Sequence, residues 1–226
     1  MFASPGFCEL CAEIGDSEAS DVECRQAWRG EGRPMWMTPS FVLFPTLGPL
    51  SLGHMLLTPR DHITAYGHLP RVLHEEANTA LRSARQYLRR FGSPLCFEHG
   101  SANELGAGGC GVVHAHMHVL PLRSSVTGRP PIAAAEWELL SADNWLEGLC
   151  GIVRRGVSYV YFESQATVRS VTPVSSLPSQ FVRKWIAEQI GISQWDWRAS
   201  DRLTDLADPM RWMHAGAPPA GFSNLG

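Results

Sequence analysis

Short apolar runs, separated by glycine and proline, predict that much of this chain forms β-strands. The predicted strands are Trp36–Phe44, Gly53–Pro59, Leu95–Glu98, Val157–Glu163 and Val168–Val174. The last two are expected to pair across a turn. We expect Pro45 to end the first strand and a loop to begin at His99-Gly100.

Two stretches have the periodicity of helices. From Leu69 to Phe91, apolar or small residues recur every three or four positions, which predicts an amphipathic helix. A second helix is predicted from Pro178 to Ile190, with Gly191 after its end. The arginines of the first helix are expected on its solvated face: Arg82, Arg85, Arg89 and Arg90.

One stretch alternates apolar residues with histidine. Ala115, Met117 and Val119 alternate with His114, His116 and His118, and Pro121 closes the run. Such alternation predicts a strand with the three histidines on one face. A glycine-rich loop, residues 106–111, precedes it, and its backbone N–H groups suit an anion. Together they suggest phosphate held beside a nucleophile or a metal.

Composition narrows the class of protein. The 226 residues allow one large domain or a domain with an appendage, and 44% are hydrophobic, as in a globular core. The net charge of −3 gives no electrostatic case for binding DNA or an anionic membrane. No apolar run is long enough to span a membrane and no signal peptide is visible, which predicts a cytoplasmic protein whose six cysteines are reduced or metal-bound.

Two cysteines near the N-terminus form a Cys-x-x-Cys pair, Cys8 and Cys11. In a cytosolic chain this spacing indicates half of a zinc site or a redox pair. A redox pair usually lies within a βαβ unit, which the pattern here does not predict. Zinc needs about two further ligands for a closed tetrahedral site.

The run His114-Ala115-His116-Met117-His118-Val119-Leu120 resembles the signature of the histidine-triad (HIT) superfamily. The Gly53-His54 pair and the Pro59-x-x-His62 pattern also match that family. The resemblance covers residues 8–121. It implies an α+β fold: a roughly five-stranded antiparallel sheet with the 69–91 helix packed on it. We therefore expect a HIT-like domain at residues 1–125 and a small α+β extension of unknown role at 126–226.

The resemblance also implies roles for residues of the site. His116 would be the nucleophile that forms a covalent nucleotidyl-histidine, His118 would donate to a non-bridging phosphate oxygen, and His54 would help to order the triad. A neutral imidazole is a competent nucleophile near pH 7. The remaining expected substrate-binding residues are Thr46, Glu98, His99, Gly109, Cys110 and Gly111.

A structural zinc site is implied by the HIT proteins and galactose-1-phosphate uridylyltransferases that have an N-terminal Cys-x-x-Cys. Carried over, the ligands are Cys8, Cys11, His62 and His114. In the rival interpretation, all three triad histidines bind a catalytic zinc, because His-x-His on a strand can chelate a metal. That interpretation leaves the two cysteines without partners.

The chain departs from the family patterns in three ways. Many HIT hydrolases have glutamine and then Ser or Thr where this chain has Cys110 and Gly111. The uridylyltransferases resemble this chain more in this part, since they also have Gly-Cys. They have glutamine, however, in place of His118. HIT nucleotide hydrolases place Asp or Asn at the position of Thr46. The expected function is a nucleotide phosphohydrolase, with a nucleotidyltransferase and a non-catalytic nucleotide-binding protein as alternatives. HIT hydrolases are often homodimers, but the C-terminal half of this chain could cover that interface.

The predicted helix of the extension carries two adjacent cations, Arg183 and Lys184. Its i, i+4 apolar spacing is explained by packing on a sheet, with both cations in solvent. The alternative is that the helix end reaches the triad and selects the leaving group.

Overall fold

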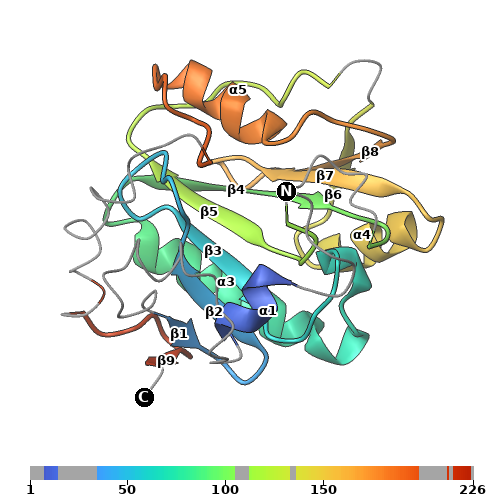
Figure 1. Ribbon diagram of the computed structural model, residues 1–226, viewed down its shortest axis with the longest axis horizontal. Coiled ribbons are helices and arrows are strands. Elements are labelled where there is room, and N and C mark those ends of the chain that lie inside the picture. Colours follow the sequence, from blue (N-terminus) through green and yellow to red (C-terminus); the bar gives the residue numbers. More distant parts are fainter. Residues whose placement is uncertain are drawn as a thin grey trace.

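A computed structural model describes residues 8–14, 35–104, 112–132, 136–198, 213 and 216–224. The described residues form one antiparallel sheet in the order β6-β8-β7-β4-β5-β3-β2-β1-β9, which can be followed in Figure 1. The strands are β1 (Trp36–Met37), β2 (Phe41–Pro45), β3 (Met55–Pro59), β4 (Ser93–Gly100), β5 (Met117–Leu122), β6 (Glu138–Leu140), β7 (Ser158–Glu163), β8 (Arg169–Val174) and β9 (Ser223–Asn224). The predicted α+β fold class is confirmed.

Four α-helices lie within the described residues. They are α1 (Glu9–Ile14), α3 (His74–Leu88), α4 (Trp145–Val153) and α5 (Phe181–Gln189). Single 3-10 turns at Tyr66–His68 and Arg71–Leu73 lead into α3. No helix in this part of the chain is both long and apolar enough to cross a lipid bilayer.

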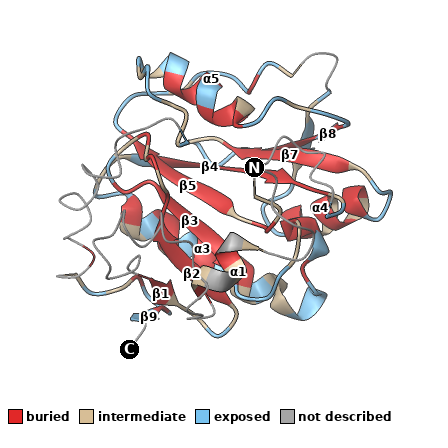
Figure 2. Ribbon diagram, in the orientation of Figure 1, coloured by how far each residue is buried: buried red, intermediate tan, exposed pale blue. Residues whose placement is uncertain are grey.

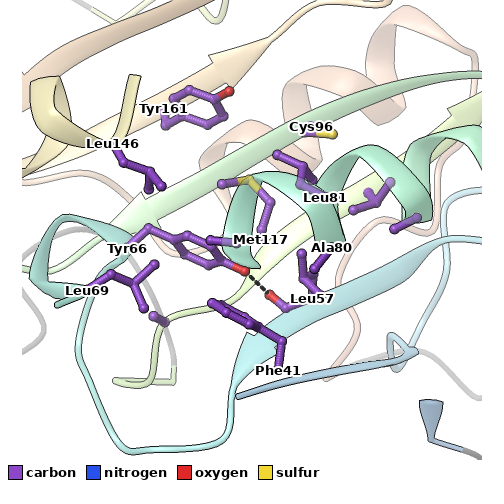
Figure 3. Packing of buried hydrophobic residues seen from close by; sticks show 14 of the residues in the cluster. Phe41, Leu57, Tyr66, Leu69, Ala80, Leu81, Cys96, Met117, Leu146 and Tyr161 are labelled. Carbon is purple, nitrogen blue, oxygen red and sulfur yellow. Dashed lines mark hydrogen bonds between the residues drawn. The ribbon is translucent and has the colours of Figure 1, made fainter. Parts of the chain in front are cut away.

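The helix α3 packs on one face of the sheet through the apolar stripe that the sequence predicts. Ala77, Ala80 and Leu81 belong to the same buried cluster as Met117 and Val119 of β5. Burying a leucine of this kind stabilises the fold by about 2 kcal/mol. Figure 3 shows part of this cluster around Tyr66, whose hydroxyl donates to the carbonyl oxygen of Leu57 at 2.9 Å.

The opposite face of the sheet carries the other two clusters. Val182 and Ile186 of α5 pack with Phe97 of β4 and Leu120 of β5. At the β2–β3 end, Leu10 of α1 belongs to a third cluster. In Figure 2 the central strands are buried, whereas α5 has a buried and an exposed side. Residues of β5 therefore alternate between the α3 face and the α5 face.

The predicted strand over 36–44 is instead a hairpin. The chain reverses after β1, so that Trp36 pairs with Leu43 of β2. At the turn, the backbone N–H of Phe41 donates to Thr38 Oγ1 at 3.0 Å, and the N–H of Thr38 donates to the carbonyl of Phe41 at 2.9 Å. Pro45 belongs to β2 rather than following it.

The histidine run is a strand only in its second half, because β5 begins at Met117. Before it, the N–H of Ala115 donates to the carbonyl of Ile63 at 2.7 Å, outside any strand ladder. Pro121 does not end the strand: it pairs with Pro94 of β4. Neither proline has an N–H, so this pair occupies a non-hydrogen-bonded position, where nothing is lost from the ladder.

Strand β4 continues through His99 and Gly100, where a loop was predicted. These residues pair with Val160 and Tyr159 of β7. A side chain at position 100 would collide with the ring of Tyr159, so glycine permits this pairing. The extension therefore continues the sheet directly from β4.

Arg85 is another correction, since it lies on the buried side of α3 and not in solvent. Its Nη1 lies 3.1 Å from Glu163 Oε1 and 3.2 Å from Cys96 Sγ. The partner Glu163 comes from β7, about eighty positions further along the chain.

The extension differs from its prediction in three further places. Helix α4 was not predicted; its Gly148 allows the close approach of Leu140 from β6. Helix α5 begins at Phe181, three residues after the predicted start. The last fifteen residues, rich in Gly, Ala and Pro, are typical of a loosely held tail, but Phe222 is buried and β9 pairs with β1.

Candidate functional site: a histidine cluster beside a thiol–imidazole cluster

Two imidazoles on the α5 face form a directed hydrogen bond. Nε2 of His54 lies 3.0 Å from Nδ1 of His118, and both side chains are buried. The N–H of Leu50 donates to His54 Nδ1 at 3.2 Å. Because Nδ1 of His54 accepts, its proton lies on Nε2, which donates to His118 Nδ1. The proton of neutral His118 is therefore on Nε2, where it can be donated to a substrate.

The surroundings of His118 keep it neutral. Its ring stacks on Phe97, with centroids 4.2 Å apart and planes 8° apart. Burial, followed by the neighbouring His54, His116 and Arg183, holds the pKa of His118 well below its ordinary value. Burial likewise lowers the pKa of His54. The pair is thus uncharged near neutral pH.

The tautomer of His116 is set by the backbone. Its Nδ1 lies 2.6 Å from the carbonyl oxygen of His114. A carbonyl only accepts, so Nδ1 carries the proton and the lone pair is on Nε2. The His116 ring lies edge-on to that of His118 at 5.3 Å between centroids, and the residue is only half-buried. Nε2 of His116 therefore has the electronic form of a nucleophile.

A second cluster contains two thiols and two imidazoles. One ligand atom from each of Cys8, Cys11, His62 and His114 lies within 4.8 Å of the others. Nδ1 of His114 is 3.4 Å from both Sγ atoms, and Nδ1 of His62 is 3.2 Å from Cys11 Sγ. The edges of a tetrahedron with Zn–S and Zn–N bonds of usual length are about 3.5 Å long. The geometry of these four residues therefore fits a zinc ion.

The outer nitrogens of both histidines in this cluster have hydrogen-bond partners. Nε2 of His114 donates to the carbonyl of Pro59 at 2.9 Å, and Nε2 of His62 lies 3.3 Å from Glu104 Oε2. Partners of this kind typically orient metal-bound imidazoles with Nδ1 toward the ion. Burial also lowers the pKa of His114 to about 4, which keeps its imidazole in the neutral, ligating form. Neither His116 nor His118 joins a potential ligand group among the described residues.

Glu98 is a buried carboxyl on the α3 face. Its Oε1 accepts from the N–H of Tyr66 at 2.8 Å, and its Oε2 accepts from the Tyr159 hydroxyl at 2.5 Å. Burial raises its pKa to about 7, against the opposing effect of these hydrogen bonds and of His116. The Glu98 carboxyl can therefore exchange a proton near neutral pH.

His99 lies on the α5 face with Phe97, whose ring centroid is 6.2 Å away. Burial lowers its pKa to about 3, and within the described part of the chain its buried Nε2 has no hydrogen-bond partner. Thr46 is also buried, and its hydroxyl donates to the carbonyl of Leu47 at 3.2 Å. The predicted residues Gly109, Cys110 and Gly111 lie outside the described residues.

Sequence reasoning missed one residue near the histidine pair. Arg183 of α5 is 3% exposed, whereas a solvated side chain was the favoured expectation. The neighbouring Lys184 is exposed and lies 4.0 Å from Glu188. The available signal was the helical phase, since Arg183 stands three positions before the buried Ile186.

Comparison with known proteins assigns the central part of the chain to a family. Residues 35–125 match the family model described as the HIT domain. This part of the chain is therefore a HIT domain, and HIT-domain proteins are nucleotide-binding proteins, hydrolases and transferases. No curated protein matches the chain.

Solved structures of three HIT proteins are similar to the chain. A Hit-like protein involved in cell-cycle regulation from Bartonella henselae is 14% identical over 46% of this chain and 81% of its own, with a TM-score of 0.36. A hypothetical histidine triad nucleotide-binding protein from Sulfolobus tokodaii is 17% identical over 66% and 90%, with a TM-score of 0.40. A Zn-bound histidine triad family protein from Mycobacterium smegmatis is 16% identical over 60% and 94%, with a TM-score of 0.37.

Proposed function

We propose that this protein is a nucleotide phosphohydrolase that works through a covalent nucleotidyl-histidine on His116. The observation that supports this most is the hydrogen bond from His116 Nδ1 to the backbone carbonyl of His114, which leaves the lone pair on Nε2. Nucleophilic attack by Nε2 requires this tautomer. The HIT domain match supports a nucleoside phosphate derivative as the substrate class.

The first half-reaction is a displacement at phosphorus. Nε2 of His116 attacks, a P–N bond forms, and the bond from phosphorus to the leaving oxygen or nitrogen breaks. The leaving group departs with the bonding electron pair and takes up a proton. His118, held neutral with its proton on Nε2, donates a hydrogen bond to a non-bridging oxygen as charge builds there.

In the second half-reaction, water attacks the same phosphorus. The P–N bond breaks, the nucleoside monophosphate leaves, and the lone pair returns to His116 Nε2. The attacking water releases one proton to solvent, which offsets the proton that the leaving group takes from solvent in the first half-reaction. Glu98, with its pKa of about 7, is our candidate to exchange a proton near His116 during the cycle.

We assign the rest of the substrate contacts to the residues around this centre. Thr46, directly after β2, and His99, on the α5 face, are proposed to line the nucleotide site. The backbone of Gly109, Cys110 and Gly111 is proposed to hold the phosphate oxygens.

We further propose that Cys8, Cys11, His62 and His114 hold a structural zinc ion. Their mutual distances and the two outer hydrogen bonds support this. Bound zinc would link α1 to the segment before β5 and contribute folding free energy. Because His114 also supplies the carbonyl that orients His116, the metal site and the nucleophile share one residue.

A substrate panel tests the proposal. The protein is incubated with nucleoside phosphoramidates, dinucleoside polyphosphates and nucleotide sugars, and release of nucleoside monophosphate is followed. We expect release from at least one class, and no release from that substrate by His116→Ala. If product forms only when a phosphorylated acceptor is added, the protein is a nucleotidyltransferase and the hydrolase assignment is wrong.

A further inference from the structure

Helix α5 brings a cation to the face of the sheet that carries His54 and His118. The helix follows the HIT domain, which ends at residue 125. It packs on the same buried cluster as Phe97, whose ring stacks on His118. Within α5, Arg183 is 3% exposed, so its guanidinium is inside the protein rather than at the surface.

The guanidinium is fixed by two backbone carbonyls. Nη2 of Arg183 donates to the carbonyl of Gly48 at 2.6 Å and to the carbonyl of Trp195 at 3.1 Å. Gly48 lies in the connection between β2 and β3, with a φ of +60° that favours glycine. The arginine therefore joins the extension to a loop of the HIT domain.

The loop between β2 and β3 leads to His54, and its backbone fixes the tautomer of the His54 imidazole. The N–H of Leu50 donates to His54 Nδ1, and the N–H of His54 donates to the carbonyl of Ser51, each at 3.2 Å. The first of these bonds puts the His54 proton on Nε2, which in turn sets the tautomer of His118. Gly48, whose carbonyl accepts from Arg183, is two residues from Leu50, whose N–H sets the tautomer of His54.

The charge of Arg183 is not neutralised by an ion pair among the described residues. The carboxylate that acts on it is Asp196, which accepts from Gln180 Nε2 at 2.7 Å and from the N–H of Arg198 at 2.9 Å. Within the described part of the chain, Nε and Nη1 of Arg183 have no hydrogen-bond partner. A buried charge of this kind acts strongly on neighbouring groups, because the low-dielectric interior screens it poorly.

We propose that Arg183 is a positioning residue for the His54–His118 pair: it anchors the 46–53 loop, whose backbone sets the tautomers of both imidazoles, and it brings a buried positive charge to this face of the sheet. The proposal deepens the proposed function, because a neutral His118 with its proton on Nε2 is the form that the mechanism uses. It also gives the extension a part in the catalytic unit.

Few groups affect the pKa of His118. Besides Arg183 on α5, the groups that act on His118 are His54, His116 and His99. Arg183 is the permanent charge among them, and its effect on both imidazoles is to lower their pKa. Loss of this charge should therefore make both imidazoles easier to protonate.

Nitrogen-15 NMR of labelled histidine tests this without any substrate. In the parent we expect His54 to be protonated on Nε2 at pH 7. In Arg183→Met the protonation midpoint of the pair should rise by about one pH unit, and His54 should populate both tautomers. Arg183→Lys keeps the charge and should keep the midpoint. Lys184→Met removes a neighbouring exposed cation and should leave both signatures unchanged.

A folded Arg183→Met protein with parental tautomers and midpoint would overturn the proposal. If that variant does not fold, Arg183→Gln is measured instead, since it retains N–H donors for the carbonyls but not the charge. A parental midpoint in Arg183→Gln would equally overturn the proposal. A failure of the proposed function would appear differently, as lack of turnover in a parent whose histidine signatures are as expected.

Discussion

His114 and His118 are four positions apart, yet their surroundings differ in kind. His114 lies among two thiols and an imidazole, with a backbone carbonyl on its outer nitrogen. His118 lies on the face of Phe97 and accepts from His54. The same side chain thus lies in a group that fits a metal ion in one place and is a neutral hydrogen-bond donor in the other. His116, between them, takes its tautomer from one and faces the other.

The largest effect should come from the residue between the two regions. His116→Ala removes the proposed nucleophile, so turnover should fall by about a thousandfold or more, while the thermal unfolding temperature stays near that of the parent. Steady-state kinetics and thermal unfolding measure both quantities. Exposed His68→Ala is the control. Activity of His116→Ala within tenfold of the parent would exclude a covalent step on this residue.

Changes in the thiol–imidazole cluster should affect the stability of the fold more than turnover. Removing zinc with a chelator, or replacing Cys8 by Ser, should lower the free energy of unfolding by about 3 kcal/mol or more, roughly 10 °C in Tm. At temperatures where the variant is still folded, kcat should fall much less than in His116→Ala. Metal content and calorimetry provide the readouts. A metal-free parent with an unchanged Tm in chelator would contradict the zinc assignment.

Substitutions in the His54–His118 pair should have an intermediate effect on kcat. His54→Ala removes the donor to His118 Nδ1, so the tautomer of His118 is no longer fixed and kcat should fall about 10- to 100-fold. His54→Gln, whose amide also has a donor, should recover part of that loss. Equal kinetics in the two variants would show that the hydrogen bond to His118 does not matter for turnover.

The smallest expected effect is the contribution of His99 to the pH dependence of the free energy of unfolding. Its pKa is about 3 when folded, against an ordinary value of 6.5, because burial disfavours the charged form. Between these values only the unfolded chain takes the proton, so stability is lost as pH falls below about 6.5. Glu98 acts in the other direction, because its raised pKa of about 7 favours the folded state as pH falls toward 4.5.

His99→Gln should therefore reduce the stability loss between pH 7 and pH 5 by about 2 kcal/mol. Denaturant unfolding at the two pH values gives this difference within each variant, which removes any constant packing effect. His68→Gln is the matched exposed control. An unchanged difference in His99→Gln would mean that His99 takes up its proton in the folded state.

The sequence predicted the parts of this molecule that depend on local pattern. The apolar stripe of α3 and the alternation of Met117 and Val119 follow from periodicity, because one face of each element must be buried. The approach of Cys8 and Cys11 to His62 and His114 is consistent with the ligand set that the HIT resemblance implied. Spacing along the chain does not predict this approach, since more than a hundred residues separate Cys8 from His114.

Long-range hydrogen bonds explain what the sequence did not predict. The strand was expected to include His114, but the N–H of Ala115 is bonded to Ile63 instead. Arg85 and Arg183 were expected in solvent, and both are buried by partners that lie far away in sequence, Glu163 and Gly48. The helical phase could have placed Arg183 on the buried side of α5, but no local pattern identifies the distant partner of either arginine.

Mass spectrometry of the intermediate tests the central claim most directly. The protein is mixed with a nucleotide substrate, quenched within one turnover, kept at alkaline pH and digested. We predict that the peptide containing His116 gains the mass of one nucleotidyl group, with fragment ions that place it on His116, and that His116→Ala gains none. Turnover with no adduct, or an adduct on another residue, would contradict the account.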